Sequence, residues 1–300
     1  MSCQFSLYWA VSSVGENTVF HIEAIYPDPV GVHPDPLDHI CRSARRAGNR
    51  ENRNARVDGI RYLQMSMRGR DIDVDYSLTH VSAEKVVVIA HGLFAHKDKA
   101  RFVALEKELL EDGYSVLRFT FSYINDKTEK KTSIVDSQVR DIRKVIDFLK
   151  EKGYARIGIV GESYGGGMSL VSFRKEIVTY VLWAPVTSHM VRKRVYLTIV
   201  FGKLFPSHAR FPFDSFDSVK NFFRQSFLIE SAKVLEAIAV PVLILHGDKD
   251  EVVPLRSSRI AAGILPNARL VPVDGAGHIF DETVLPVAFH HTRKWFHSYL

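Results

Sequence analysis

Cysteine is scarce in this chain, and the sequence features of secreted and membrane proteins are missing. The 300 residues include only Cys3 and Cys41, which are too few for a disulfide framework and fit a reducing compartment. No apolar run reaches the about 18 residues of a membrane-spanning helix. The first residues have no lysine or arginine ahead of their apolar part, as a secretory signal would. We therefore expect a cytoplasmic protein without a membrane span.

Signatures of metal, nucleotide and nucleic-acid binding are missing as well. No Cys/His cluster has the spacing of a zinc site, and no glycine-rich loop has the pattern that holds a phosphate. The net charge is +6, but lysine and arginine are spread along the chain rather than gathered in one arm. His290, His291 and His297 have no metal-ligand partners in the sequence, so we expect them at the surface. These absences predict no cofactor, no metal and no nucleic-acid partner.

Residues 1–57 differ in character from the rest of the chain. The segment Pro27-Asp28-Pro29 recurs as Pro34-Asp35-Pro36, and six arginines follow between residues 42 and 56 in a polar stretch. Few apolar residues there could be buried, so we expect an N-terminal extension that is mobile, most of all over 31–57. The extension is either a basic interaction tail or dispensable. The orderly pattern of a folded domain occupies residues 58–300.

In this domain, short apolar segments alternate with segments of helical periodicity. Strands are expected at 62–73, 74–79, 85–90, 114–121, 157–160, 178–183, 240–245 and 270–273. Helices are expected at 102–110, 134–149, from 168 onward, at 257–264 and at 284–299. Such alternation predicts an α/β fold with a mostly parallel sheet covered by helices on both faces.

One serine lies in a strand–turn–helix context that suggests a nucleophile. Gly161-Glu162-Ser163-Tyr164-Gly165 has the pattern Gly-x-Ser-x-Gly, preceded by an apolar strand and followed by a helical segment. A turn this tight needs small residues two positions before and two positions after the serine, and both positions hold glycine. Because a serine hydroxyl is a weak nucleophile, it needs an adjacent base, an acid that orients the base, and donors for the oxyanion.

Candidates for these roles follow later strands of the predicted sheet. Asp250 lies after the strand at 240–245, and His278 lies after the strand at 270–273. The carboxyl ends of parallel strands meet at one edge of a sheet, where open α/β sheets place their sites. Asp248 is an alternative acid. The backbone amides of Leu93 and Tyr164 are the expected oxyanion donors.

Two further residues near these motifs have both a functional and a structural interpretation. His91 precedes the Gly92-Leu93 pair and could be a base, but a histidine that bonds its own loop is the commoner case. Glu162 is either a solvated or hydrogen-bonded acid, or a residue that tunes His278. The sequence leaves both interpretations open.

The interval between the strands at 178–183 and 240–245 is too long for a simple crossover. Residues 186–227 contain eight phenylalanines and seven lysines or arginines against two aspartates. We expect a cap inserted over the active site that contributes to substrate binding. The alternative is a helical pair packed on the domain, in which the phenylalanines are ordinary core residues.

Four motifs resemble those of the α/β-hydrolase superfamily: His91-Gly92-Leu93-Phe94, Gly161-Glu162-Ser163-Tyr164-Gly165-Gly166, the segment from His246 to Pro254, and Gly277-His278. The chain is similar to the branch of serine aminopeptidase-like hydrolases, monoacylglycerol lipases and cinnamoyl (feruloyl) esterases over residues 60–300. This resemblance implies an eight-stranded α/β-hydrolase sheet with a small helical cap after strand 6. It also implies that the acid is Asp250, three residues past the glycine of the His-Gly pair.

The resemblance implies a serine hydrolase that cleaves carboxylic esters of small molecules through an acyl-enzyme intermediate. Ser163 would attack, His278 would transfer the proton and Asp250 would orient His278. Many relatives have histidine where this chain has Glu162, so a serine peptidase, an aminopeptidase or a thioesterase is an alternative. An aminopeptidase would need an acidic anchor in the cap, whereas this cap is basic, which favours esters. An inactive hydrolase-fold binding protein is a further alternative, and the sequence does not indicate an oligomeric state.

Overall fold

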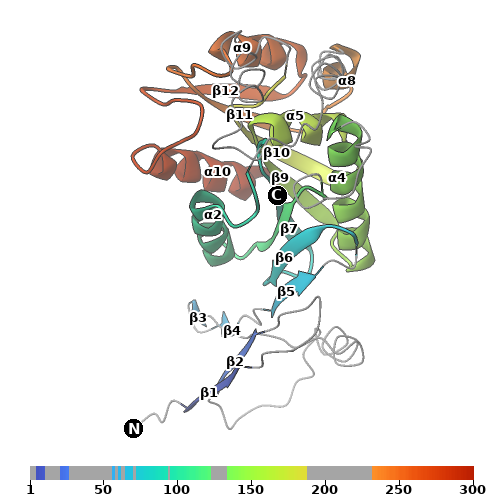
Figure 1. Cartoon of the computed structure of the whole chain (residues 1–300), viewed down its shortest axis with the longest axis vertical. Coiled ribbons are helices and arrows are strands. Elements are labelled where there is room, and N and C mark those ends of the chain that lie inside the picture. Colours follow the sequence, from blue (N-terminus) through green and yellow to red (C-terminus); the bar gives the residue numbers. More distant parts are fainter. Residues whose placement is uncertain are drawn as a thin grey trace, which may run out of the picture.

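An eight-stranded sheet forms the centre of the computed structural model, which describes residues 5–10, 21–26, 56–57, 60–61, 65–69, 72–93, 95–122, 134–187 and 232–300 (Figure 1). Its strands are β5 (Met65–Gly69), β6 (Asp75–His80), β7 (Lys85–Ala90), β8 (Ser115–Thr120), β9 (Arg156–Glu162), β10 (Ile177–Trp183), β11 (Val242–Gly247) and β12 (Ala268–Val273). The order across the sheet is β12-β11-β10-β9-β7-β8-β6-β5. Strands β7 to β12 are parallel, whereas β6 pairs antiparallel with β8 and β5 with β6. The predicted mostly parallel, eight-stranded sheet is confirmed.

Helices cover both faces of this sheet, as the alternation predicted. They are α2 (Ala100–Glu111), α4 (Ile134–Glu151), α5 (Ser163–Val171), α8 (Ala232–Glu236), α9 (Leu255–Ile264) and α10 (Leu285–Tyr299). Side chains of α2 and α10 share one buried cluster with the sheet, and side chains of α4, α5, α8 and α9 share the other. Figure 1 shows the same division, with α2 and α10 on one side of the sheet.

Strand β7 shows why the apolar runs of this sequence form strands. Its valines at 86 and 88 pack in one cluster, whereas Val87 and Ile89 pack in the other. Successive side chains of a strand point to opposite faces, and both faces here are covered, so a continuous apolar run is required. Burial of each such side chain contributes about 1.5–3 kcal/mol.

The N-terminal region contains strands that the sequence analysis did not anticipate. Strand β1 (Phe5–Ala10) pairs antiparallel with β2 (His21–Tyr26), and β3 (Arg56–Val57) pairs antiparallel with β4 (Ile60–Arg61). The remainder of the expected extension, and the expected cap beyond Thr187, lie outside the described residues. None of the helices in the described ranges combines the length and apolar character needed to cross a membrane.

Candidate active site

The turn between β9 and α5 holds Ser163 in a left-handed conformation, with φ of 53°. A Cβ added to Gly161 would lie 2.5 Å from the Cα of Gly166. A Cβ added to Gly165 would lie 2.3 Å from the carbonyl oxygen of His91. Both glycines are therefore required by close backbone contacts, as the motif predicted. The turn presents the Ser163 side chain at the N-terminus of α5.

His278, in the loop after β12, lies directly against this serine. The Ser163 Oγ is 2.8 Å from the His278 Nε2, which is the separation of a good hydrogen bond. The carbonyl of Ser163 accepts a hydrogen bond from the Val186 amide, 2.9 Å away, which ties the turn to the end of β10. The two side chains therefore have the geometry of a nucleophile and its base.

Asp250 completes a hydrogen-bonded chain from the other side of the imidazole. Its Oδ2 accepts a hydrogen bond from His278 Nδ1 at 2.8 Å. Its Oδ1 accepts the amides of Val252 and Val253, both at 2.8 Å. Because the loop holds one carboxylate oxygen, the other is aimed at the imidazole.

His246 is a second histidine on the same carboxylate, and the sequence analysis assigned it no contact there. Its Nε2 lies 3.1 Å from Asp250 Oδ2 and 3.0 Å from the Val253 carbonyl, while the Ser258 hydroxyl lies 2.7 Å from its Nδ1. Nε2 thus faces two oxygen acceptors, and the Ser258 hydroxyl holds the other ring nitrogen. Its spacing of four residues from Asp250 was the signal available in the sequence.

Burial alone would raise the pKa of Asp250. Hydrogen bonds from His246 and His278, the charge of His278 and the Val253 amide outweigh burial and hold that pKa well below its usual range. Asp250 is therefore ionised at neutral pH, as an acceptor for an imidazole N–H must be.

The alternative acid, Asp248, has different partners. Its Oδ1 accepts the Gly275 amide at 2.8 Å, and its Oδ2 lies 3.5 Å from the Lys249 ammonium. Asp248 thus links two loops, whereas Asp250 contacts His278. The structure brings Asp250, rather than Asp248, to the imidazole.

The loop between β7 and α2 approaches the serine closely and carries Leu93. A Cβ added to Gly92 would lie 3.1 Å from Ser163 Cβ and 3.7 Å from Ser163 Oγ. Leu93 follows this contact directly, and Tyr164 follows Ser163 at the start of α5. Both expected oxyanion donors therefore lie on segments adjacent to the hydroxyl.

His91 belongs to the framework of the same loop. Its Nδ1 donates to the Gly92 carbonyl at 2.7 Å, and its Nε2 accepts the Phe121 amide at 3.1 Å. Burial lowers its pKa to about 4. A neutral ring with both nitrogens bonded to backbone favours the structural interpretation of His91.

Glu162 is buried beside the nucleophile and paired with Arg101 of α2. Its side chain is 3% exposed, and it accepts three hydrogen bonds from the guanidinium at 2.7, 2.8 and 3.0 Å. Burial raises the pKa of this carboxyl, and the charge of Arg101 opposes the shift. The sequence analysis expected Glu162 to be a solvated or a hydrogen-bonded acid. The structure excludes the solvated side chain.

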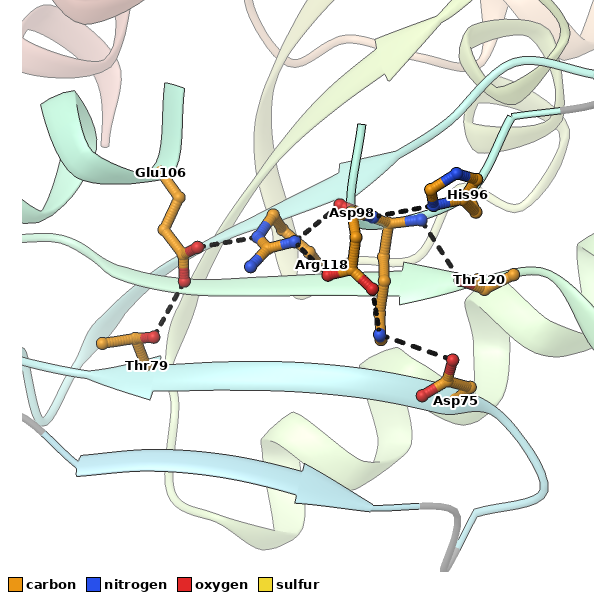
Figure 2. Close-up of polar contacts among 8 residues, drawn as sticks. Asp75, Thr79, His96, Asp98, Glu106, Arg118 and Thr120 are labelled. Carbon is orange, nitrogen blue, oxygen red and sulfur yellow. Dashed lines mark hydrogen bonds and ion pairs between the residues drawn. The ribbon is translucent and has the colours of Figure 1, made fainter. Parts of the chain in front are cut away.

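A buried polar network anchors the far end of the β7–α2 loop (Figure 2). Arg118 of β8 donates to Glu106 Oε2 at 2.7 Å, to the Lys97 carbonyl at 2.6 Å and to Asp98 Oδ1 at 3.0 Å. The other oxygen of Glu106 accepts the Thr79 hydroxyl at 2.8 Å. Figure 2 shows Arg118 between the helix and the loop, so one guanidinium joins β8, α2 and the loop.

No group of three or more His, Cys, Asp or Glu side chains in the described parts of the chain is arranged to hold a metal ion.

Known proteins match the chain in sequence. A family model described as "Alpha/beta hydrolase domain" matches residues 83–185, and one described as "alpha/beta hydrolase fold" matches residues 208–282. The human protein ABHD12B is 26% identical over 221 residues, which are 70% of this chain. The chain spans 59% of the length of that curated relative.

Solved structures match the fold. Est1E from Butyrivibrio proteoclasticus superimposes with a TM-score of 0.58 at 20% identity, covering 78% of this chain and 98% of Est1E. Est1E with ferulic acid bound gives a TM-score of 0.59 at 22% identity, over 75% and 95% of the two chains. An esterase from Exiguobacterium antarcticum gives 0.56 at 19% identity, over 75% and 95%. Strand order, the strained serine turn and both family models agree that this chain belongs to the α/β-hydrolase superfamily.

Proposed function

We propose that the protein is a serine hydrolase that cleaves carboxylic esters of small molecules through an acyl-enzyme intermediate. The observation that carries this proposal is the chain of two 2.8 Å hydrogen bonds from Ser163 through His278 to Asp250. A nucleophile, a base and an orienting acid in this order are the requirement for acyl transfer by a serine.

In the acylation step, Ser163 Oγ bonds to the ester carbonyl carbon while its proton passes to His278 Nε2. The carbonyl oxygen becomes an oxyanion, which the amides of Leu93 and Tyr164 would bind. The imidazolium is stabilised by the ionised Asp250. When the tetrahedral intermediate collapses, the C–O bond to the alcohol breaks, and His278 returns the proton to the leaving alkoxide.

In the deacylation step, water takes the place of the alcohol. His278 accepts a proton from water, whose oxygen bonds to the acyl carbon, and Ser163 leaves with that proton as the acid is released. The expected cap at 186–227 would meet the acyl or alcohol part of the substrate, and its phenylalanines would favour apolar groups.

The state of Glu162 supports esters over peptides with a free amino terminus. Recognition of a substrate ammonium needs a carboxylate that is open to the substrate. Glu162 is buried, and its oxygens are taken by Arg101. The ferulic acid bound to Est1E adds an ester of an aromatic acid to the substrates worth testing.

The proposal is tested with purified full-length protein and a fluorophosphonate probe, together with a panel of nitrophenyl esters of increasing chain length, methyl ferulate, a thioester and aminoacyl nitroanilides. Esters should be the best substrates, and the probe should label Ser163. Ser163→Ala should lower turnover by about four to six orders of magnitude. Ser169→Ala is the control, because that hydroxyl is buried in α5 and bonds the Gly165 carbonyl. Labelling of another serine, or preference for the nitroanilides, would contradict the proposal.

A further inference from the structure

The Asp250 carboxylate contacts a histidine that no step of the proposed reaction uses. The ring of His246 lies on the same oxygen as His278, with its Nε2 3.1 Å from Asp250 Oδ2. The side chains of His246 and Asp250 are both fully buried. A polar contact in such a place is not replaced by water when one partner is removed.

The groups around His246 Nε2 identify this nitrogen as a donor. It bonds the Val253 carbonyl at 3.0 Å and lies 3.1 Å from the carboxylate oxygen of Asp250. A carbonyl oxygen only accepts, and so does the Asp250 carboxylate, because its pKa is held well below its usual range. A nitrogen without a proton would direct its lone pair at both oxygens. We therefore infer that His246 Nε2 carries a hydrogen.

Val253 connects His246 to the other oxygen of the carboxylate. The Val253 amide donates to Asp250 Oδ1 at 2.8 Å, and the carbonyl of the same residue accepts from His246. One ring nitrogen therefore contacts Oδ2 and also holds the residue whose amide binds Oδ1. Rotation of the carboxylate away from His278 would disturb contacts at both of its oxygens.

Helix α9 fixes the ring of His246 from the opposite side. The Ser258 hydroxyl, in the first turn of α9, lies 2.7 Å from His246 Nδ1 and is fully buried. The contacts run in order from Ser258 through His246, Asp250 and His278 to Ser163. The triad thus continues into β11 and α9.

We propose that His246 is a positioning residue for the triad: its Nε2–H holds Asp250 and Val253 in the arrangement in which the carboxylate faces His278, and Ser258 fixes the ring that does so. This inference rests on the proposed function, because it assigns His246 to the acid of that reaction.

Two amide variants of the full-length protein separate the donor from mere packing. In His246→Gln the amide group is as many bonds from Cβ as Nε2 is, so it can still donate to Asp250 and Val253. In His246→Asn the amide group takes the place of Nδ1, so it can reach only Ser258. His246→Asn should lower kcat by about 10- to 100-fold, because His278 is less well oriented. His246→Gln should stay nearer to the native kcat.

KM should change little in both variants, since His246 has no surface that a substrate could contact. In the Asp250→Asn background, His246→Asn should change kcat by less than about twofold, because the carboxylate through which it acts is gone. Equal kcat values for the two amide variants would overturn the inference. So would a loss in the Asp250→Asn background as large as in the native protein.

His80→Asn is the matched control. His80 is also a buried histidine, with its Nδ1 2.5 Å from the Tyr154 hydroxyl. It ends β6, which runs antiparallel to β8, so it lies at the opposite edge of the sheet from the triad. His80→Asn should reduce the free energy of unfolding but leave kcat unchanged.

A second pair of variants decides if the His246 variants do not fold. Ser258→Ala removes one hydroxyl from the ring and should lower kcat by about 3- to 10-fold. Ser257→Ala, whose hydroxyl bonds the Pro254 carbonyl instead, should leave kcat unchanged. Equal kcat values for these two serine variants would overturn the inference.

If the native protein neither reacts with a fluorophosphonate nor cleaves any ester, the proposed function fails. NMR of the histidine ring nitrogens in labelled full-length protein then tests His246 by itself, because it shows which nitrogens carry a proton. His246 should be protonated on Nε2. His278 should be protonated on Nδ1 in the native protein and should become a mixture of tautomers in His246→Asn. A bare Nε2 on His246, or an unchanged His278 in that variant, would overturn the inference.

Discussion

His91 offers a test of the fold that needs no substrate. Its ring is fully buried, Nδ1 donates to the Gly92 carbonyl, and Nε2 accepts the Phe121 amide. Protonation would place a second N–H against an amide that is itself a donor. The fold therefore prefers the neutral ring, and burial lowers the pKa from 6.5 to about 4.

The size of the effect follows from linkage. Between the two pKa values the unfolded chain binds a proton that the folded protein excludes, so stability falls as the pH falls through this window. Each pH unit costs up to about 1.4 kcal/mol, which is about 2 kcal/mol from pH 6.5 to about pH 5 and about 3 kcal/mol over the whole window. Above pH 6.5 the contribution of the neutral His91 ring to the free energy of unfolding is fully present.

The measurement is urea unfolding of the native protein and of His91→Gln at several pH values. The variant should be less stable at neutral pH, and the difference in free energy of unfolding should shrink by about 2 kcal/mol by about pH 5. Leu105→Ala is the control: it removes a buried side chain without changing a titrating group, so its difference should stay constant. Parallel curves for His91→Gln would refute the reasoning.

Three further predictions concern the site and its support. Asp250→Asn should slow hydrolysis by about 10⁴-fold in a folded protein, because it alters the group that orients His278, whereas Asp248→Asn should be nearly silent. Gly92→Ala should lower kcat/KM by about 10- to 100-fold, because its Cβ would press on Ser163, while Gly263→Ala, which meets nothing within 4 Å, should leave kcat/KM unchanged. Arg118→Met should lower the free energy of unfolding by about 3–5 kcal/mol, measured in urea, because buried acceptors lose their donor.

Each of these has an outcome that would count against it. An Asp248 variant slower than the Asp250 variant would move the acid to Asp248. Equal kcat/KM values for Gly92→Ala and Gly263→Ala would show that the β7–α2 loop tolerates displacement. The double variant Arg118→Met with Glu106→Met should recover most of the stability that Arg118→Met loses, since Glu106 is then no longer a buried charge without its partner. Failure to recover it would mean that Arg118 acts mainly through the loop.

The sequence predicted the sheet well because its strands are buried on both faces. Lys85–Ala90 and the segment before Ser163 are mostly apolar, and their existence as strands needs little tertiary information. The serine turn was predictable for a similar reason, since backbone crowding restricts Gly161 and Gly165 to the smallest residue. Local steric demands are visible in a single sequence.

The choice of acid and the environment of Glu162 were not predictable in this way. Asp248 and Asp250 are two residues apart in one turn. Contacts made by the folded loops place Asp250 against His278: the amides of Val252 and Val253 and the His246 ring hold its carboxylate, whereas the Gly275 amide holds Asp248. Glu162 gains its partner from α2, 61 residues away in sequence. Its burial depends on packing that local periodicity does not encode.

The end of β11 was also not predictable from the local sequence pattern. The apolar run suggested a strand at 240–245, but the strand continues through His246 and Gly247. His246 belongs to the buried part of the sheet because Ser258, Val253 and Asp250 satisfy its ring. A hydropathy pattern does not predict that a polar residue is buried in a strand when its hydrogen-bond partners come from later segments of the chain.

The order of the strands has a consequence for how this protein would lose activity. The nucleophile follows β9 in the middle of the sheet, whereas His278 follows β12, which lies at one edge of the sheet and has mostly partly exposed residues. Detachment of β12 from β11 would carry the base away while Ser163 and its surroundings stay folded. Heat inactivation would then come before global unfolding, and amide hydrogen exchange would show it first at this edge. An inhibitor that binds Ser163 and His278 together would connect the β12 edge to the centre of the sheet. It would therefore delay both the loss of activity and the detachment of β12.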